Sequence, residues 1–316
     1  MLSRRQFLAV PAAALAAAPR LSSTERVDRA IRGQDVDRLP FSLWHHFGLE
    51  KQGPRKHAEA TLEFHERYGT DLVKVMSDFP YPKPAGNWWE LKVEANPFAP
   101  QVHALEIIAD GLRGRAHFVE TVFNPWNVAE KLSSKEEVIR LRNEQPQKLL
   151  DALEVIAQSE ANHARLALKA KASGIFLAIA NAQDGIMTRA EYAKWSEPFD
   201  RLVLQAAGGA PLNILHLHGD KVYVDYFLTG WPAGGVNYGS QETGFPLPAA
   251  RARFAGVLLG GVDERSYRTR SAGELREDAA RARREAGPRL IFTPGCSVPN
   301  DSRPDELLRM KEAVQF

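Results

Sequence analysis

Short apolar runs alternate with helical stretches along most of this chain, and no other feature of the sequence restricts the fold as strongly. Strands that alternate with helices form parallel β/α units. About eight such units predict an α/β fold, a (β/α)8 TIM barrel formed by a single domain over residues 25–316. An open doubly wound sheet is the alternative, but its dinucleotide-binding form lacks the Gly-x-Gly-x-x-Gly that should follow the first strand. The expected strands are Phe41 to Trp44, Asp71 to Met76, Ala116 to Val122, Ile175 to Ile179, Leu212 to His218, Gly235 to Tyr238, Val257 to Gly260 and Leu290 to Thr293.

The first twenty residues have the pattern of a cleavable export signal. Arg4 and Arg5 precede Phe7-Leu8 and an Ala-rich stretch from Ala9 to Ala18, which resembles a twin-arginine signal. That stretch is about ten residues long, too short to span a bilayer. Residues 1–20 are therefore predicted to be a twin-arginine signal peptide that directs the protein through the twin-arginine export machinery to the periplasm or the extracellular space. The alternative is a basic N-terminal tail.

Charge and cysteine content limit the partners of the folded part. The formal net charge is +2, and Arg4 and Arg5 together account for it. No basic run follows them, so neither nucleic acid nor an anionic membrane is an expected partner. No later segment is apolar and long enough to suggest stable membrane insertion. The only cysteine, Cys296, excludes an internal disulfide, so its thiol is buried, metal-bound or reactive.

Two histidines and this cysteine stand at the ends of apolar runs. His216 and His218 close the run that begins at Leu212, and Cys296 follows the run that begins at Leu290. In one parallel sheet these ends converge at the carboxyl edge, where α/β enzymes place their chemistry. Alternation along the strand points both histidines inward, about 7 Å apart, so His216, His218 and Cys296 are candidate ligands of a zinc ion with an open fourth position. The alternative is a pair of interior histidines that bind an anionic substrate without a metal.

Other polar residues at strand ends are candidates for catalysis. Asp78 follows the second run and offers a carboxylate to the pocket as a cation partner or proton relay, unless it only begins a turn. Asp263, after the glycine pair 260–261, allows the same two interpretations. His45 and His46 follow the first run and point to opposite sides if the chain is extended. One of them is expected to line the pocket as an acid or base, and the alternative is a packed or surface histidine.

The segment after the fourth run carries further polar groups. Asn181 and Asp184 can hydrogen-bond a polar substrate edge, or they supply ordinary loop polarity before the next helix. Thr188 with Glu191 has the spacing of a capping box and predicts the start of that helix. Ser271 with Glu274 predicts a second such start.

The order and spacing of these runs resemble the uroporphyrinogen decarboxylase superfamily, which also contains zinc-dependent corrinoid methyltransferases. The resemblance extends from about residue 38 to the end and implies the (β/α)8 barrel, a small-molecule substrate at its mouth and a homodimer. It also implies that Trp44, Asn181, Asp184, Tyr192 and Asp263 contact the substrate. The motifs are Arg38 to Trp44, Leu72 to Asp78, Gly174 to Ile179, Thr188 to Tyr192 with Pro198-Phe199, His216 to Gly219, Leu259 to Asp263 and Thr293 to Pro299.

The decarboxylases of this superfamily hold substrate carboxylates with an arginine-rich loop after the first strand. Here that loop, Trp44 to Glu50, contains no arginine, so a multiply carboxylated tetrapyrrole loses its main charge-assisted contacts. Asp78 matches the aspartate that faces the pyrrole nitrogens, whereas Asn181 stands near a position often occupied by Asp.

The methyltransferases hold zinc with a His-x-Cys strand end and a later Pro-Gly-Cys strand end. His216 and Cys296 match two of those ligands, and His218 replaces the middle cysteine. The resemblance therefore implies zinc as cofactor and a corrinoid or tetrapyrrole as substrate or partner.

Three functions follow from these residues. The first is a zinc-dependent enzyme that transfers a methyl or similar group. The second is a metal-free decarboxylase of a carboxylated, tetrapyrrole-like substrate, in which Asp78 stabilises positive charge. The third is a non-catalytic, exported protein that binds a ligand in the barrel mouth.

Overall fold

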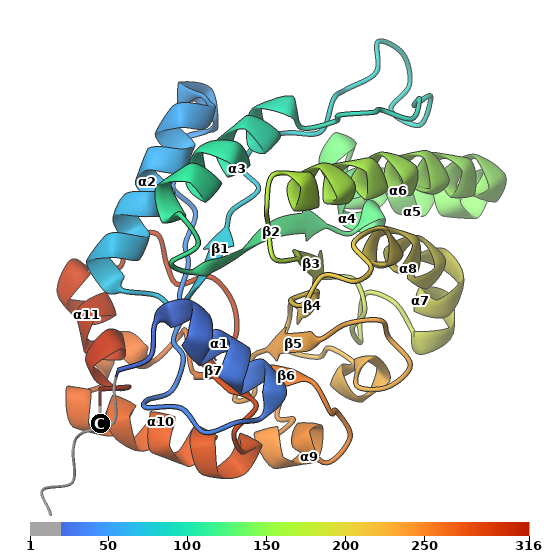
Figure 1. Cartoon of the computed structure of the whole chain (residues 1–316). Coiled ribbons are helices and arrows are strands. Elements are labelled where there is room, and N and C mark those ends of the chain that lie inside the picture. The colour runs from blue at the N-terminus through green and yellow to red at the C-terminus, as the bar shows by residue number, and fades with distance from the viewer. Residues whose placement is uncertain (1–19, 316) are drawn as a thin grey trace, which may run out of the picture.

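A computed structural model describes residues 20–315 of the chain. Its centre is a parallel sheet of seven strands, which are neighbours in the sheet in the same order as in the sequence. Figure 1 shows this sheet curled into a ring with helices around its outside. The strands are β1 (Leu72–Val75), β2 (His117–Phe123), β3 (Ile175–Ile179), β4 (Ile214–Leu217), β5 (Gly235–Tyr238), β6 (Val257–Val262) and β7 (Leu290–Pro294).

The predicted strand from Phe41 to Trp44 is wrong as a regular strand. Only Phe41 pairs, through a parallel bridge to Phe292 in β7. The Phe292 N–H donates to the Pro40 carbonyl at 2.8 Å, and the Asp71 N–H donates to the Phe41 carbonyl at 2.7 Å, so this segment connects the two edges of the sheet. The next donor along β7 would be residue 294, and Pro294 has no N–H to extend the pairing toward Trp44. The sheet is thus seven-stranded and TIM-barrel-like instead of an eight-stranded barrel.

Helices follow the strands in the expected alternation. Both predicted capping boxes are confirmed, because Thr188 and Ser271 accept hydrogen bonds from the backbone N–H groups of Glu191 and Glu274. The helices are α1 (Ser23–Arg32), α2 (Pro54–Tyr68), α3 (Ala99–Leu112), α4 (Pro125–Leu132), α5 (Lys135–Glu144), α6 (Pro146–Lys169), α7 (Arg189–Trp195), α8 (Glu197–Ala206), α9 (Leu247–Arg251), α10 (Ala272–Ala286) and α11 (Pro304–Glu312), with short 3-10 turns at Glu50–Gln52, Val224–Phe227 and Tyr267–Thr269.

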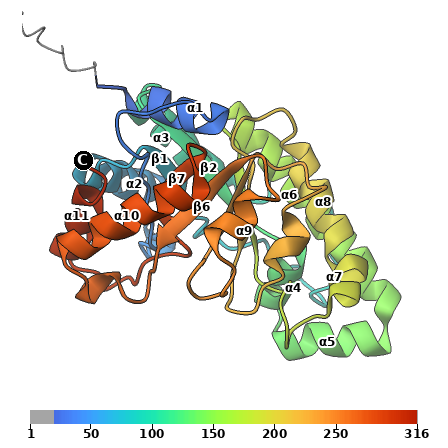
Figure 2. The ribbon, with the colours of Figure 1, turned by 90° about the horizontal axis from the view of Figure 1, so that it is seen from below.

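The two ends of the ring differ in what covers them. Helix α1 lies across one end, with Val27 buried in the cluster that contains Leu72 of β1 and Ile214 of β4. Figure 2 shows α1 at one end of the molecule and α4, α5 and α7 at the other. The latter helices follow the carboxyl ends of β2 and β3. The end with the strand carboxyl termini therefore stays available for a site.

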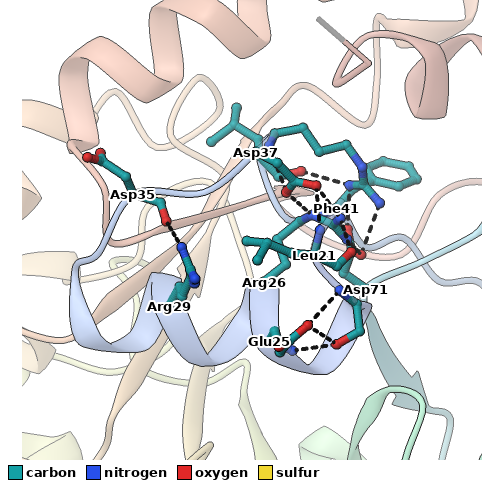
Figure 3. Close-up of polar contacts among 11 residues, drawn as sticks. Leu21, Glu25, Arg26, Arg29, Asp35, Asp37, Phe41 and Asp71 are labelled. Atoms are coloured by element: carbon teal, nitrogen blue, oxygen red, sulfur yellow. Dashed lines mark hydrogen bonds and ion pairs between the residues drawn. The ribbon is translucent and has the colours of Figure 1, made fainter. Parts of the chain in front are cut away.

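A buried ion-pair network fixes α1 to the start of β1 (Figure 3). The fully buried Asp71 carboxylate accepts from Arg26 Nη1 and Arg38 Nη1, each at 2.6 Å, and from the Phe41 N–H at 2.9 Å. Arg26 also pairs with Asp37 at 2.7 Å. The network thus joins α1, the bridging segment and β1 at the end opposite the predicted site.

The predicted signal peptide, residues 1–20, falls almost entirely on residues 1–19, which lie outside the described part of the chain. Among the described residues, no helix combines the length and apolar character needed to cross a membrane.

Candidate active site

The three candidate zinc ligands lie together at the carboxyl ends of β4 and β7. His216 belongs to β4, His218 follows β4 directly, and Cys296 follows β7. Their ligand atoms all lie within 4.8 Å of one another. Cys296 Sγ is 3.1 Å from His218 Nδ1 and 3.8 Å from His216 Nε2. Two nitrogens and one sulfur that converge in this way are a donor set that suits zinc with an open fourth position.

The backbone that carries Cys296 is held by close packing. A Cβ at Gly295 would overlap the backbone of Gly239, so only glycine fits where the end of β7 passes the end of β5. The Gly295 N–H also donates to Glu264 Oε2 at 3.1 Å. These contacts hold the thiol at the strand edge from two sides.

Asn237 of β5 fixes the orientation of His216. Its Nδ2 lies within hydrogen-bond distance of three acceptors, the carbonyls of Leu259 and Pro294 and the hydroxyl of Thr293, so its Oδ1 must face His216. His216 Nδ1 therefore donates to Asn237 Oδ1 at 2.6 Å, which leaves the Nε2 lone pair directed toward Cys296. A ligand histidine that donates its other N–H to an oxygen is the usual support of a metal site. Asn237 was not predicted from the sequence, although a polar residue inside the run Gly235 to Tyr238 was a usable signal.

Charge in this group favours the thiolate. Burial opposes ionisation of Cys296, but the adjacent imidazoles of His216 and His218 lower the pKa of its thiol to about 4. Burial lowers the pKa of His216, whereas the hydrogen bond to Cys296 raises the pKa of His218. The thiolate is the form of cysteine that binds metals and acts as a nucleophile.

These residues form part of the wall of a cavity of about 560 Å³. Three other predicted residues, Trp44, His46 and Asn181, also line it. Asn181 is almost fully buried, and its Oδ1 accepts from Asn124 Nδ2 at 2.8 Å. The cavity is large enough for a small organic substrate.

Lys74 of β1 is a cavity residue that the sequence analysis did not single out. Its ammonium is 2.9 Å from Met76 Sδ and lies over the rings of Phe176 and Trp44, at 5.0 and 5.6 Å from their centres. Burial lowers the pKa of Lys74 to about 8. A lone lysine inside the apolar run Leu72 to Val75 was the available signal, because both faces of a parallel sheet are normally buried.

His46 and Asp78 form a pair beside the cavity. His46 Nδ1 is 2.9 Å from Asp78 Oδ1, and the buried His57 of α2 places its Nδ1 3.7 Å from Asp78 Oδ2. Burial opposes ionisation of Asp78, but the hydrogen bond from His46 holds the pKa of this carboxyl below its usual value. His57 was not singled out by the sequence analysis, because nothing in a helical pattern indicates that one of its histidines faces an aspartate.

The structure places His46 on the cavity wall and His45 away from it. The His45 ring packs against Phe47 and Phe64, with ring centres 4.8 and 5.1 Å apart. Burial lowers the pKa of His45. A catalytic role for His46 and Asp78 stays a prediction, and the position of His45 suits packing.

Three predicted substrate contacts do not reach the cavity. Asp184 is exposed, and Tyr192 is fully buried in α7, where its hydroxyl donates to Asp200 Oδ2 at 2.7 Å. Asp263 lies with Glu242 and Glu264 in a group whose carboxylate oxygens are within 4.8 Å of one another. Burial raises the pKa of Glu242 to about 8, so a shared proton relieves the repulsion in this acidic group.

Asp200 gives a prediction for stability against pH. Burial raises the pKa of Asp200 to about 7, and Tyr192, Asn124 and Ser196 all donate to it. Between about pH 4 and pH 7 the folded state holds a proton that the unfolded state has lost, so stability should fall as pH rises, by roughly 3 kcal/mol. Asp200→Asn mimics the protonated acid and should remove this fall. Thermal unfolding of both proteins at pH 4.5 and 7.5 measures the difference; equal pH dependence would contradict the assignment.

Comparison with known proteins identifies the family. The sequence matches the family model described as uroporphyrinogen decarboxylase (URO-D) over residues 87–316. The protein therefore belongs to the uroporphyrinogen decarboxylase family, and the resemblance seen in the sequence motifs is confirmed. No curated protein matches the sequence.

Solved structures share the fold at low sequence identity. A methyltransferase from Methanosarcina mazei superposes with a TM-score of 0.75 and 15% identity, over 93% of this chain and 98% of that one. A B12-independent methionine synthase from a Shewanella species, in complex with selenomethionine, superposes with a TM-score of 0.58 and 11% identity, over 87% of this chain and 90% of that one. A vitamin-B12-independent methionine synthase from Listeria monocytogenes superposes with a TM-score of 0.55 and 9% identity, over 87% of this chain and 95% of that one. At these identities the likeness concerns the fold alone.

Proposed function

We propose that this protein is a zinc-dependent methyltransferase that acts on a small substrate in the cavity at the barrel mouth. The observation that carries the proposal is the convergence of His216, His218 and Cys296, whose ligand atoms lie within 4.8 Å of one another. The methyltransferase that shares this fold supports the choice of reaction. In the reaction, the bond between the methyl group and its donor breaks, a bond from the methyl carbon to the acceptor forms, and the acceptor loses its proton.

The residues present fit a zinc ion. Cys296 supplies a thiolate, and His216 offers a neutral nitrogen whose partner nitrogen is held by Asn237. When bound there, zinc would supply a Lewis acid that lowers the pKa of an acceptor thiol or hydroxyl. The chain itself would supply the three zinc ligands and enclose the acceptor in the cavity. The Lys74 ammonium lies on the wall of the same cavity. The donor class implied by the family is a methylated corrinoid.

A direct assay separates this function from its rivals. The zinc-loaded protein should demethylate methylcobalamin in the presence of a small thiol, which is followed by the absorbance change of the corrin. The metal-free protein should not. Equal rates with and without zinc would contradict the proposal.

Asn237→Ala tests how His216 is oriented. Loss of the amide leaves His216 Nδ1 without its acceptor, and removal of such a partner weakens metal binding by about 10–100-fold. Zinc affinity is measured by competition with a coloured chelator. Asn213→Ala is the matched control, because it also removes a buried amide but one that donates to the Ala207 carbonyl at 2.7 Å. Equal zinc affinity in the two variants would show that Asn237 does not support the metal site.

A metal-free decarboxylase is the second candidate, and Lys74 favours it. A buried lysine with a pKa lowered to about 8 can donate a proton to the carbanion that remains after carbon dioxide leaves. Release of carbon dioxide by metal-free protein, abolished in Lys74→Met, would support this candidate over methyl transfer.

We also propose that the protein is exported through the twin-arginine machinery. The proposal rests on Arg4 and Arg5 and the apolar stretch that follows them. Replacement of both by lysine should leave most of the protein in the cytoplasm, as measured by cell fractionation. Arg20→Lys, which keeps the arginine pair, is the matched control. Continued export of the double variant would refute the signal.

A further inference from the structure

A second, smaller chamber opens beside the main cavity. Its volume is about 220 Å³, and Phe123 and Lys131 line both spaces. Asp78, Tyr81 and Glu160 are among its other wall residues. The chamber therefore continues the main cavity past Lys131, and it contains polar groups that the proposed methyl transfer does not use.

Three buried polar atoms of the chamber wall have no hydrogen-bond partner in the described part of the chain. They are Glu160 Oε2, on a residue of α6 that is 1% exposed, the hydroxyl of Tyr81, and Asp78 Oδ2. A buried polar atom without a partner destabilises the folded state, and a ligand that pairs with it removes this penalty. Burial raises the pKa of Glu160 well above its usual value, and no cation of the described residues lies within salt-bridge distance of it, which favours the neutral carboxyl, a hydrogen-bond donor. Glu160 and Tyr81 therefore both offer donors.

Lys131 of α4 supplies a cation at the opening between the two spaces. Its ammonium lies over the Phe123 ring, 2.8 Å from the ring centre, and its side chain is accessible to solvent. Desolvation lowers the pKa of Lys131 to about 8, which still leaves most of the group charged at pH 7. Lys83 adds a second cation to the chamber wall, whereas Asp78 supplies one anion. With Glu160 neutral, the chamber has an excess of one positive charge.

The Asp78 carboxylate does not cancel this preference for an anion. Its Oδ1 accepts from His46, and its Oδ2, which has no hydrogen-bond partner among the described residues, lies 3.7 Å from His57 Nδ1. The wall thus offers a ligand three donors, an ammonium, a carboxylic acid and a phenol, against this one unpartnered acceptor.

We propose that the chamber is a subsite for the carboxylate end of the substrate, held by Lys131, Glu160 and Tyr81. This inference rests on the proposed function in placing the reacting end of the same substrate near Cys296. The cations of the chamber come from α4 and the segment after β1, whereas the loop Trp44 to Glu50, which follows the bridging segment, has no arginine. The chamber has the volume of roughly seven liquid water molecules, so it takes a short aliphatic carboxylate and not a macrocycle.

Binding of simple probes tests the subsite independently of catalysis. Calorimetric titrations with pentanoate, pentanamide and pentylamine are made on the metal-free and zinc-loaded protein. Pentanoate should bind, more tightly than the amide, and pentylamine should not bind. Lys131→Met should weaken pentanoate binding at least about tenfold through loss of a charge-assisted hydrogen bond. Glu160→Gln should change it less than about threefold, because the amide still donates.

Lys135→Met is the matched control, because Lys135 lines the main cavity but not the chamber. It should leave pentanoate binding unchanged, and the unfolding temperature of each variant shows that it is folded. Equal pentanoate affinity in Lys131→Met and wild type would overturn the proposal. So would pentylamine binding that Glu160→Gln abolishes, which would assign the chamber to an ammonium group. Pentanoate binding without zinc supports the subsite even if methyl transfer fails, so the two proposals fail separately.

Discussion

Replacement of Cys296 by alanine is expected to remove zinc and methyl transfer together. Four-ligand zinc sites bind with roughly 10–16 kcal/mol, so each ligand contributes about 3 kcal/mol, and its loss weakens binding by about a hundredfold or more. Cys296 is also the only sulfur ligand available, because the chain has no other cysteine. Elemental analysis of the purified protein after dialysis should give about one zinc per chain for wild type and almost none for Cys296→Ala.

Histidine variants complete this test. His216→Ala should lose zinc as Cys296→Ala does. His45→Ala should keep it, because the His45 ring packs against Phe47 and Phe64 and does not line the cavity. One equivalent of zinc retained in both His216→Ala and Cys296→Ala would refute the ligand assignment.

Asp71→Ala is expected to have the largest effect on stability. The variant leaves the buried Arg26 and the partly buried Arg38 without their shared carboxylate and removes the acceptor of the Phe41 N–H. Removal of one partner from a buried ion pair costs about 3–5 kcal/mol, which lowers the unfolding temperature of a domain of this size by roughly 5–15 °C. Differential scanning calorimetry measures the change.

Asp37→Ala is the matched control for this network. Asp37 also pairs with Arg26, but its side chain is 19% exposed compared with 0% for Asp71. Its removal should therefore lower the unfolding temperature clearly less than removal of Asp71. Equal losses in the two variants would mean that burial of Asp71, and its contact with the bridging segment, do not determine the stability of this end of the barrel.

Much of the site could be predicted from strand ends. Parallel strands bring their carboxyl ends to one edge, so His216, His218 and Cys296 could be grouped although 78 residues separate the second histidine from the cysteine. Lys74 and Asn237 could also have been predicted, because each is a polar residue within an apolar strand, but the prediction covered only residues that follow strand ends.

Other parts could not be predicted because they depend on how helices and loops pack. His57 and Glu160 lie on α2 and α6, and a helical pattern does not show which polar residue turns toward a cavity. Tyr192 is part of a motif that resembles the family, yet α7 buries it against Asp200. The strand expected at Phe41 to Trp44 is apolar enough, but pairing ends after one bridge because the next donor in β7 would be residue 294, and Pro294 has no N–H.

X-ray absorption at the zinc edge tests the central claim most directly. If His216, His218 and Cys296 hold the metal, the spectrum of the purified protein should show one sulfur and two imidazole nitrogens from the chain around each zinc. The sulfur should be absent in Cys296→Ala protein loaded with excess zinc. A spectrum without sulfur in the wild type, or wild-type protein that takes up no zinc, would contradict the account and leave these three residues as contacts of a metal-free site.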